Sequence, residues 1–433
     1  MQRLIKIVAV VAMLGLVAAA CSGGDDDEPT ATGETAGGET AATGAEGALS
    51  EFGESTDADP ALVEKALGPV EEVPDIVLAS IARADQDLDQ ATIDKAMECW
   101  SQPECDTGSG GELVMGYADG GGHLNVWRAV THMEAILQAL TYPEIGTIVS
   151  TEALWDQDPA VPAGDINFLV QRGADFIIGY PDAGVAIADA IAAAEEAGVP
   201  YIPFSAGWVG LPEQEGALIP GEDYTSVVGE DLCALGESFA QVLNDNIDSG
   251  SIGVLGGTPG NALSLGWQQC LTPALNDSIS LVSDPVDTFW LNDVALEAVL
   301  GMLSTDPDIK GYAYEYADGM YTALQAYDEL GIPLDDVTMA LRTDEQTLFC
   351  DWVERDIPNY HIYFSAGGNF QSRTAVTAQM MKIAGAEIPP EIVVPHVMRE
   401  VGTDDCDPNR VTPTVSGTSL VPDEVLAQMF PEG

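Results

Sequence analysis

The stretch from Gly164 to Gly207 constrains the fold more than any other part of the chain. It contains two short apolar runs, residues 176–178 and 201–204, and each follows a helical pattern that ends at a glycine. Continuous apolar runs of this length are typical of parallel strands buried on both faces. Between the runs, alanine and isoleucine recur at helical spacing up to Gly198, which stands where a C-terminal cap belongs. The stretch therefore predicts a βαβ unit.

Parallel sheets of this kind bind ligands beyond the carboxyl ends of their strands. Residues 180–182 follow the first apolar run, and residues 205–207 follow the second. The pattern therefore predicts that both segments line a cleft.

The same stretch carries a longer motif, formed by Gln171, Gly173, Ala174, Asp175, Ile177, Ile178, Pro181, Asp182 and the run Ala197-Gly198-Val199-Pro200. This motif resembles the type I periplasmic binding proteins of the ribose- and galactose-binding family. Later segments extend the resemblance from about Glu112 to about Val397. The resemblance implies an α/β fold of two Rossmann-like lobes with parallel sheets, joined by a three-stranded hinge, with the ligand cleft between the lobes.

The N-terminus has the pattern of an export signal. Arg3 and Lys6 precede an apolar run over residues 7–20, and small residues then lead to Cys21. This resembles a bacterial lipoprotein signal over residues 1–20, which implies a diacylated Cys21 that anchors the protein to the outer face of the cell membrane. An ordinary signal peptide with a spare cysteine is the alternative. Residues 21–56 are poor in apolar residues and predict a disordered acidic tether.

Charge narrows the classes of ligand. The chain has 71 acidic and 14 basic residues and a formal net charge of −57. A surface this acidic repels nucleic acids and anionic lipid, so neutral or cationic small ligands fit better. A high-salt habitat is one explanation for the composition, because salt screens the self-repulsion.

The cysteines fit an exported protein. Apart from Cys21, six cysteines remain, and their order along the chain suggests the pairs Cys99 with Cys105, Cys233 with Cys270, and Cys350 with Cys406. Six cysteines allow fifteen pairings, and the local first pair is the most secure. The spacings do not match zinc motifs, so we expect no metal and no cofactor.

The remaining chain divides into four parts. Residues 57–111 predict a helical N-terminal extension, for which packing on a lobe is the simplest role. We expect lobe 1 at 112–226 with 366–390, lobe 2 at 227–365 with about 391–402, and a C-terminal extension at 403–433. Strands expected in lobe 2 include residues 280–286, and residues 392–397 are expected to form a last strand. The hinge crossings are expected near residues 224–230, 340–345 and 364–370.

The resemblance places candidate ligand contacts in the loops at the strand ends. They combine planar polar groups, which bond sugar hydroxyls, with aromatic faces, which cover the C–H surface of a ring. The candidates are Asn125, Trp127, Asp182, Ser205, Trp208, Asn261, Trp267, Tyr316, Asp318, Asp344 and Asn369. Asp344 is the strongest of them, because it lies where the family places an aspartate that bonds sugar hydroxyls. Asp182 and Ser205 also suit helix caps or turns.

One departure from the family keeps the ligand class open. The arginine that often follows the first strand of the second lobe is absent, and Asn261, Ser264 and Trp267 occupy its area. Several acidic residues also allow a cationic ligand held by an aromatic cage.

The resemblance implies an extracytoplasmic lipoprotein that captures a sugar or related polar solute for an ABC importer, as a monomer that meets the importer's membrane subunits. The alternatives are a binding protein for an amino acid, amine or nucleoside, and a ligand-sensing receptor component. The sequence contains no Gly-x-Ser-x-Gly or His-Glu-x-x-His motif, so we do not expect an enzyme.

Overall fold

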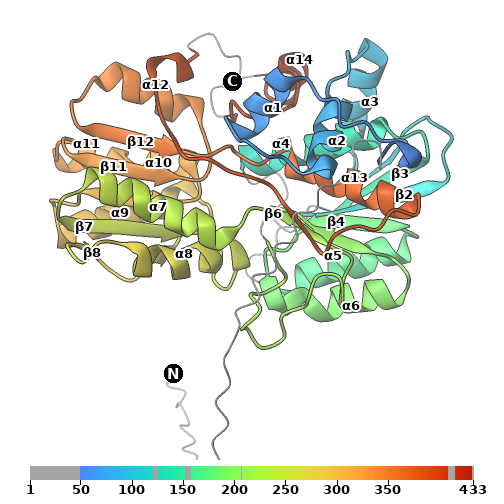
Figure 1. Ribbon diagram of the computed structural model, residues 1–433, viewed down its shortest axis with the longest axis horizontal. Helices are drawn as coiled ribbons and strands as arrows, with labels where there is room; N and C mark the ends of the chain where they lie inside the picture. Colours follow the sequence, from blue (N-terminus) through green and yellow to red (C-terminus); the bar gives the residue numbers. More distant parts are fainter. Residues whose placement is uncertain (1–48, 120–124, 152–157, 206, 408–414, 432–433) are drawn as a thin grey trace, which may run out of the picture. The chain divides into compact units, whose positions relative to one another are not determined.

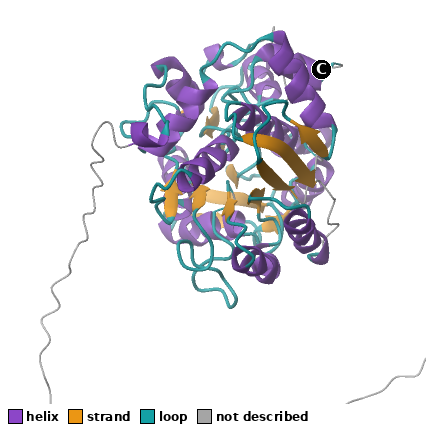
Figure 2. Ribbon diagram, turned by 90° about the vertical axis from the view of Figure 1, so that its right-hand side faces the viewer, coloured by secondary structure: helices purple, strands orange, loops and turns teal. Residues whose placement is uncertain are grey.

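The computed structural model describes residues 49–119, 125–151, 158–205, 207–407 and 415–431. These residues form two α/β lobes, each with a mostly parallel sheet and helices packed against it (Figures 1 and 2). The expected signal segment, Cys21 and most of the expected tether lie outside the described residues. Within the described ranges, no helix has both the length and the apolar character needed to cross a membrane.

The first lobe is built on a five-stranded sheet. Its order is β1 (Glu104–Asp106), β3 (Ile145–Thr151), β2 (Leu113–Asp119), β4 (Phe176–Tyr180) and β5 (Tyr201–Pro203), and only β1 runs antiparallel to its neighbour. A bridge between Phe204 and Val228 continues this edge to β6 (Val227–Gly229), which pairs in parallel with β13 (Glu391–Val393). Two expectations are corrected here: β1 lies in the segment expected to be helical, and β13 lies beside the first lobe's sheet.

Helices pack against this sheet as the βαβ pattern requires. α4 (Val126–Leu140) and α13 (Gln371–Ile383) lie on one side, and α5 (Ala160–Gln171) and α6 (Ala188–Glu196) lie on the other (Figure 1). A short 3-10 helix, η2 (Gly184–Ile187), leads into α6. Gly198 has φ +81°, and its N–H donates to the Glu195 carbonyl at 2.9 Å. The expected glycine cap and the central βαβ unit are thus confirmed.

The second lobe is built on a seven-stranded sheet. The order is β14 (Arg399–Glu400), β12 (Tyr360–Phe364), β11 (Val337–Leu341), β10 (Gly311–Tyr314), β7 (Gly250–Gly256) and β8 (Ile279–Leu281), and β9 (Val286–Asp287) also pairs with β7. The strand expected at residues 280–286 is therefore two short strands, and the strand expected at 392–397 ends at Val393. Pro285 and Pro395 explain both breaks, because proline lacks the N–H that a strand ladder needs.

Six helices complete the second lobe: α7 (Leu232–Asn246), α8 (Ala262–Ala274), α9 (Asn292–Thr305), α10 (Ala317–Ala323), α11 (Gln325–Leu330) and α12 (Gln346–Arg355). α7 and α8 pack closely together. A Cβ on Gly236 of α7 would lie 2.1 Å from the Trp267 carbonyl oxygen on α8, so this contact requires glycine.

All three expected disulfides are present. Cys99 pairs with Cys105, Cys233 with Cys270, and Cys350 with Cys406. They tie α3 (Gln90–Ser101) to β1, α7 to α8, and α12 to the segment after η3 (Thr403–Asp405). The six cysteines therefore offer no free thiolate to a metal.

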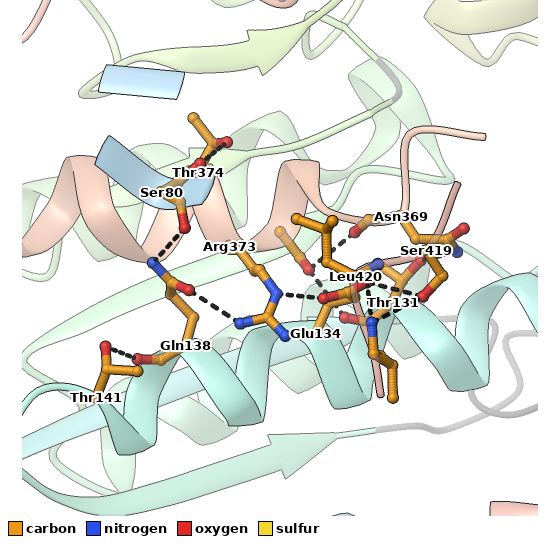
Figure 3. Close-up of polar contacts among 12 residues, drawn as sticks. Ser80, Thr131, Glu134, Gln138, Thr141, Asn369, Arg373, Thr374, Ser419 and Leu420 are labelled. Carbon is orange, nitrogen blue, oxygen red and sulfur yellow. Dashed lines mark hydrogen bonds and ion pairs between the residues drawn. The ribbon is translucent and has the colours of Figure 1, made fainter. Parts of the chain in front are cut away.

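The N-terminal extension packs on the first lobe. It comprises η1 (Leu49–Phe52), α1 (Pro60–Leu67), α2 (Asp75–Ala84) and α3 (Gln90–Ser101). The hydroxyl oxygens of Ser80 on α2 and Thr374 on α13 are 2.9 Å apart (Figure 3). The Ser80 carbonyl accepts a hydrogen bond from the side-chain amide of Gln138 on α4. Residues 49–56 were expected to belong to the disordered tether, but Glu54 is buried and pairs with Arg83 at 2.6 Å. This ion pair explains why the ordered part begins earlier.

The C-terminal extension crosses between the lobes. Residues 415–421 pass from the second lobe to α4 of the first lobe, and α14 (Asp423–Met429) then packs against α3. The Glu134 carboxylate of α4 accepts from Ser419 Oγ and the Leu420 N–H, and it pairs with Arg373 of α13 (Figure 3). One expected hinge segment is corrected: residues 340–345 join β11 to α12 within the second lobe and do not cross between the lobes. The third crossing is the segment between β13 and β14, and the C-terminal extension makes a fourth.

Candidate functional site

The strand order decides which loops meet between the lobes. In the first sheet the parallel strands run β3-β2-β4-β5, and in the second they run β8-β7-β10-β11-β12. The order reverses between β2 and β4 in one lobe and between β7 and β10 in the other. Such reversal points open a crevice at the carboxyl ends of the strands. Among the described residues, those that follow β4, β7 and β10 therefore face the space between the lobes.

This space contains a small cavity, which we call the inner cavity. Its volume is about 20 Å³, which is room for about one water molecule. The residues that line it come from both lobes: Asn125, Trp127, Arg128, Tyr180, Leu263, Trp290, Glu315, Tyr316, Arg342 and Thr343.

Arg128 dominates the first lobe's wall. It lies in the first turn of α4, where Asn125 caps the helix by accepting from the Arg128 N–H at 2.9 Å. The guanidinium donates to Asp119 at 2.5 Å and to Asp182 at 2.6 Å. Burial opposes the charge, but the two carboxylates hold the pKa of Arg128 above its ordinary value. Burial raises the pKa of Asp182 to about 6, although Arg128 lowers it.

Glu315 dominates the second lobe's wall. It follows β10, and its carboxylate accepts from Ser264 Oγ at 2.5 Å, from Trp267 Nε1 at 2.5 Å and from Trp290 Nε1 at 3.2 Å. Burial raises the pKa of Glu315 to about 7, against the effect of these donors. Both α8 and the loop before α9 therefore hold this carboxyl group in place.

Arg342 joins the two lobes at the cavity. It directly follows β11, pairs with Glu230 at 2.9 Å, and donates to Ser205 Oγ at 2.7 Å. Ser205 follows β5 of the first lobe and has φ +64°, an uncommon conformation for a residue other than glycine. Strained residues of this kind cluster at ligand sites.

Aromatic rings cover the rest of the cavity. Tyr180 meets Trp127 and Trp290 edge to face, with ring centroids 5.8 and 5.9 Å apart. Trp290 has φ +55°, and its ring lies over Gly257, where an added Cβ would come within 2.0 Å of the indole. Position 257 must therefore be glycine if the Trp290 ring is to lie where it does.

A second small cavity lies beside the first, and we call it the side cavity. Trp127, Tyr316, Asp318, Asp344, Asn369 and Ser416 line it. Asn369 Nδ2 donates to Thr131 Oγ1 at 2.9 Å, while its buried Oδ1 has no protein partner in the part of the chain that the structure describes. This oxygen is a ready acceptor for a ligand hydroxyl.

Asp344 is occupied by the C-terminal extension. Its Oδ1 accepts from Ser416 Oγ at 2.5 Å and Thr418 Oγ1 at 3.0 Å, and its Oδ2 accepts from the Gly417 N–H at 2.5 Å and the Thr418 N–H at 3.3 Å. Both carboxylate oxygens are therefore paired within the chain.

The eleven expected ligand contacts divide into three groups. Six line the two cavities: Asn125, Trp127, Tyr316, Asp318, Asp344 and Asn369. Four lie behind the walls, because Asp182 pairs with Arg128, Ser205 with Arg342, Trp267 with Glu315, and Asn261 donates to the Asp182 carbonyl. Trp208 lines a different hollow, between the strands β6 and β13 and the helix α7, and is not among the residues that line the inner cavity.

Sequence reasoning missed Arg128, Arg342 and Trp290 as cavity residues, whereas Tyr180 belongs to the segment 180–182 that was expected to line a cleft and does line the inner cavity. The two arginines offered a signal, since basic residues are rare in this chain and each lies within two positions of an expected ligand contact, Arg128 beside Trp127 and Arg342 before Asp344. Trp290 offered none, because it lies in the loop between β9 and α9, where no ligand contact was expected. After β10, Glu315, Tyr316 and Asp318 were all possible hydrogen-bonding groups, and only Tyr316 and Asp318 were expected as ligand contacts.

The charges of the inner cavity are internally balanced. Arg128 and Arg342 are each paired with carboxylates, so neither presents an excess positive charge to an anion. Planar guanidinium and carboxylate groups between aromatic faces can bond neighbouring hydroxyls while the rings cover apolar ligand surface. The arrangement therefore suits a neutral polyol.

Solved structures with the same fold include sugar and polyol binders. The chain aligns with an ABC transporter solute-binding protein from Actinobacillus succinogenes 130z with bound D-allose at 18% identity and a TM-score of 0.56, over 66% of this chain and 97% of that one. It aligns with one from Bacillus halodurans C-125 with bound myo-inositol at 16% identity and a TM-score of 0.55, over 67% and 96%. A third, from Mycobacterium smegmatis with bound glycerol, has 19% identity and a TM-score of 0.55, over 68% and 95%.

At these identities the structural matches show the fold, and the sequence comparison shows the family. No curated protein sequence matches the chain. The profile of the periplasmic binding protein domain family matches residues 156–381, which is just over half of the chain. The expected two-lobed α/β fold is thus confirmed, and the chain belongs to the periplasmic binding protein domain family.

Proposed function

We propose that this protein is the extracytoplasmic substrate-binding component of an ABC importer and that it captures a neutral sugar or related polyol without chemical turnover. The observation that carries the proposal is the inner cavity, where paired arginines, Glu315 and four aromatic rings from both lobes converge at the reversal points of both sheets. Ligand groups bound by both lobes favour the closed arrangement over the open one.

Binding requires the lobes or the lining side chains to move. Pockets for small molecules have volumes of roughly 300–1,000 Å³, whereas the inner cavity has about 20 Å³. We expect that movement to be absorbed where the chain crosses between the lobes, near residues 229–232, 364–371 and 394–398, and in the C-terminal crossing. Arg342 lies beside the crossing at β6 and donates hydrogen bonds to Glu230 and Ser205. A movement of the lobes would change these hydrogen bonds.

A thermal-shift screen of the purified chain tests the proposal. We expect a pentose, hexose or cyclitol to raise the melting temperature, because a ligand at about 100 times its Kd stabilises a protein by about 2.7 kcal/mol. Putrescine, choline, amino acids and nucleosides serve as the competing panel. A shift confined to amines would contradict the sugar assignment and leave the family unchanged, and slow consumption of the sugar would contradict the binding-only role.

We also propose that Cys21 carries a lipid anchor that holds the protein at the outer face of the cell membrane. The apolar run ending in small residues before Cys21 supports this. Metabolic labelling with a radioactive fatty acid should mark the wild-type chain and not a Cys21→Ser variant. Equal labelling of both would contradict the anchor.

A further inference from the structure

An open groove, which we call the entrance groove, lies beside the inner cavity. Its volume is about 610 Å³, within the range of small-molecule pockets. Four aromatic residues line it: Trp100, Trp290, Tyr316 and Phe430. Asn125, Trp290 and Tyr316 line the inner cavity as well, so the two spaces are neighbours that share these side chains as a wall.

Both terminal extensions contribute to this groove. Trp100 lies at the end of α3, and Phe430 directly follows α14. Both residues lie outside positions 156–381, which the family profile matches. The indole of Trp100 is half-buried and fixed by a hydrogen bond from Nε1 to the Ala129 carbonyl at 3.2 Å. The extensions therefore add aromatic surface where a ligand would leave the inner cavity.

Hydrogen bonds hold several polar side chains of the groove in place. Asp318 accepts from the Tyr316 hydroxyl at 2.9 Å and from Asn292 Nδ2 at 3.1 Å, and Asp293 lies on the same wall. No arginine or lysine lines the groove in the described part of the chain. Aromatic faces, amides and carboxylates without a cation suit a neutral sugar ring and disfavour an anion.

We propose that the entrance groove is a second sugar subsite, so that the protein takes a disaccharide or longer glycoside with one ring in the inner cavity and the next ring against Trp100 and Phe430. This inference rests on the proposed sugar-binding function. In this proposal the inner cavity binds the first sugar ring, and contacts in the groove make the protein prefer a disaccharide or longer glycoside over a monosaccharide.

Titration calorimetry on matched sugar pairs tests the subsite. The probes are D-glucose with maltose and cellobiose, D-xylose with xylobiose, and D-galactose with galactobiose. We expect the longer sugar of at least one set to bind about ten times more tightly than its monosaccharide. Trp100→Ala and Phe430→Ala should each remove most of that gain and leave the monosaccharide Kd unchanged.

Trp352→Ala is the matched control, since Trp352 is also half-buried and its Nε1 donates to a backbone carbonyl, at Tyr360, away from the groove. It should keep the full gain. Phe430 lies close to the chain end, so its variant serves if Trp100→Ala does not fold. Two results would overturn the subsite alone. One is equal affinity of the wild-type protein for monosaccharides and longer sugars. The other is that Trp100→Ala and Phe430→Ala weaken the binding of monosaccharides and longer sugars by the same factor. Binding of none of the sugars would overturn the proposed function and the subsite together.

Discussion

Asp344 and Glu315 are buried carboxyl groups that follow neighbouring parallel strands, β11 and β10, on the side of the second lobe that faces the first. Asp344 accepts four hydrogen bonds from residues 416–418 of the C-terminal extension. Glu315 is held by three donors of its own lobe and lines the inner cavity.

The difference shows that a strand-end position does not by itself make a ligand contact. Whether such a carboxylate can contact a ligand depends on whether another segment of the chain already bonds it. The C-terminal extension supplies Asp344 with the hydroxyl and N–H donors that a sugar would otherwise offer. We therefore assign Asp344 to holding the extension and Glu315 to the ligand, and the following predictions test this division.

Replacing Asp344 should have the largest effect on stability. Asp344→Ala leaves four donors without their acceptor, and we expect the free energy of unfolding in urea to fall by about 3 kcal/mol. Sugar affinity should stay within about threefold of wild type. Asp284→Ala, at an exposed carboxyl group, is the control and should change stability by less than about 0.5 kcal/mol. A stable Asp344→Ala variant that no longer binds sugar would reverse the assignment.

The raised pKa of Glu315, about 7, predicts a pH dependence of stability. Between its ordinary pKa near 4.5 and about 7, the unfolded chain loses this proton while the folded chain keeps it, so stability falls as the pH rises. The loss from this group is roughly 3 kcal/mol and is complete above pH 7. Glu315→Gln should flatten the curve of unfolding free energy between these pH values.

The control for this prediction is Glu297→Gln, which removes the same charge from an exposed position on α9. It should keep the wild-type slope. Burial also raises the pKa of Glu345 to about 7 and that of Asp182 to about 6, so both contribute a slope of the same sign in all three proteins. If Glu315→Gln and wild type lose stability in parallel, Glu315 is already ionised in the folded protein.

Displacing Trp290 should weaken binding more mildly. Gly257→Ala places a Cβ 2.0 Å from the Trp290 indole, which must then move away from Glu315 and from the cavity. We expect the Kd for the sugar found in the screen to rise about tenfold. Gly301→Ala, whose Cβ would meet no atom within 4 Å, is the control. An unchanged Kd would show that the indole is not a ligand face.

Trp208 should have the smallest effect. It lines the hollow beside the hinge and not the inner cavity. Trp208→Ala should therefore keep the Kd within about twofold of wild type. A loss of more than about tenfold would place the ligand at the hinge side instead.

Local sequence patterns predicted the fold well. The apolar runs around Ile177 and Ile202, the Gly198 cap and the three cysteine pairs all follow from residues close in sequence or from simple order along the chain. The interrupted strands were missed because Pro285 and Pro395 were not weighed against the apolar pattern. The ordered Glu54 was missed because its partner Arg83 belongs to a separate helix.

The site was predicted only in part, because its partners are distant in sequence. Arg128 meets Asp182 across 54 positions, and Asp344 meets Ser416 across 72. Trp267 and Glu315 are 48 apart, and the tryptophan proves to lie behind the carboxyl group. A motif can place such residues at the same crevice, but only the packed structure shows which of them faces the cavity.

The affinity of Glu315→Gln tests the central assignment most directly. The measurement is calorimetric titration of this variant, beside wild type and Asp344→Ala, with the sugar that gives the largest thermal shift. We predict that above pH 7, where Glu315 is ionised, Glu315→Gln weakens binding by about 100-fold, because a ligand hydroxyl loses a charged acceptor, while Asp344→Ala binds nearly as wild type. Full affinity in Glu315→Gln together with lost binding in Asp344→Ala would contradict the account.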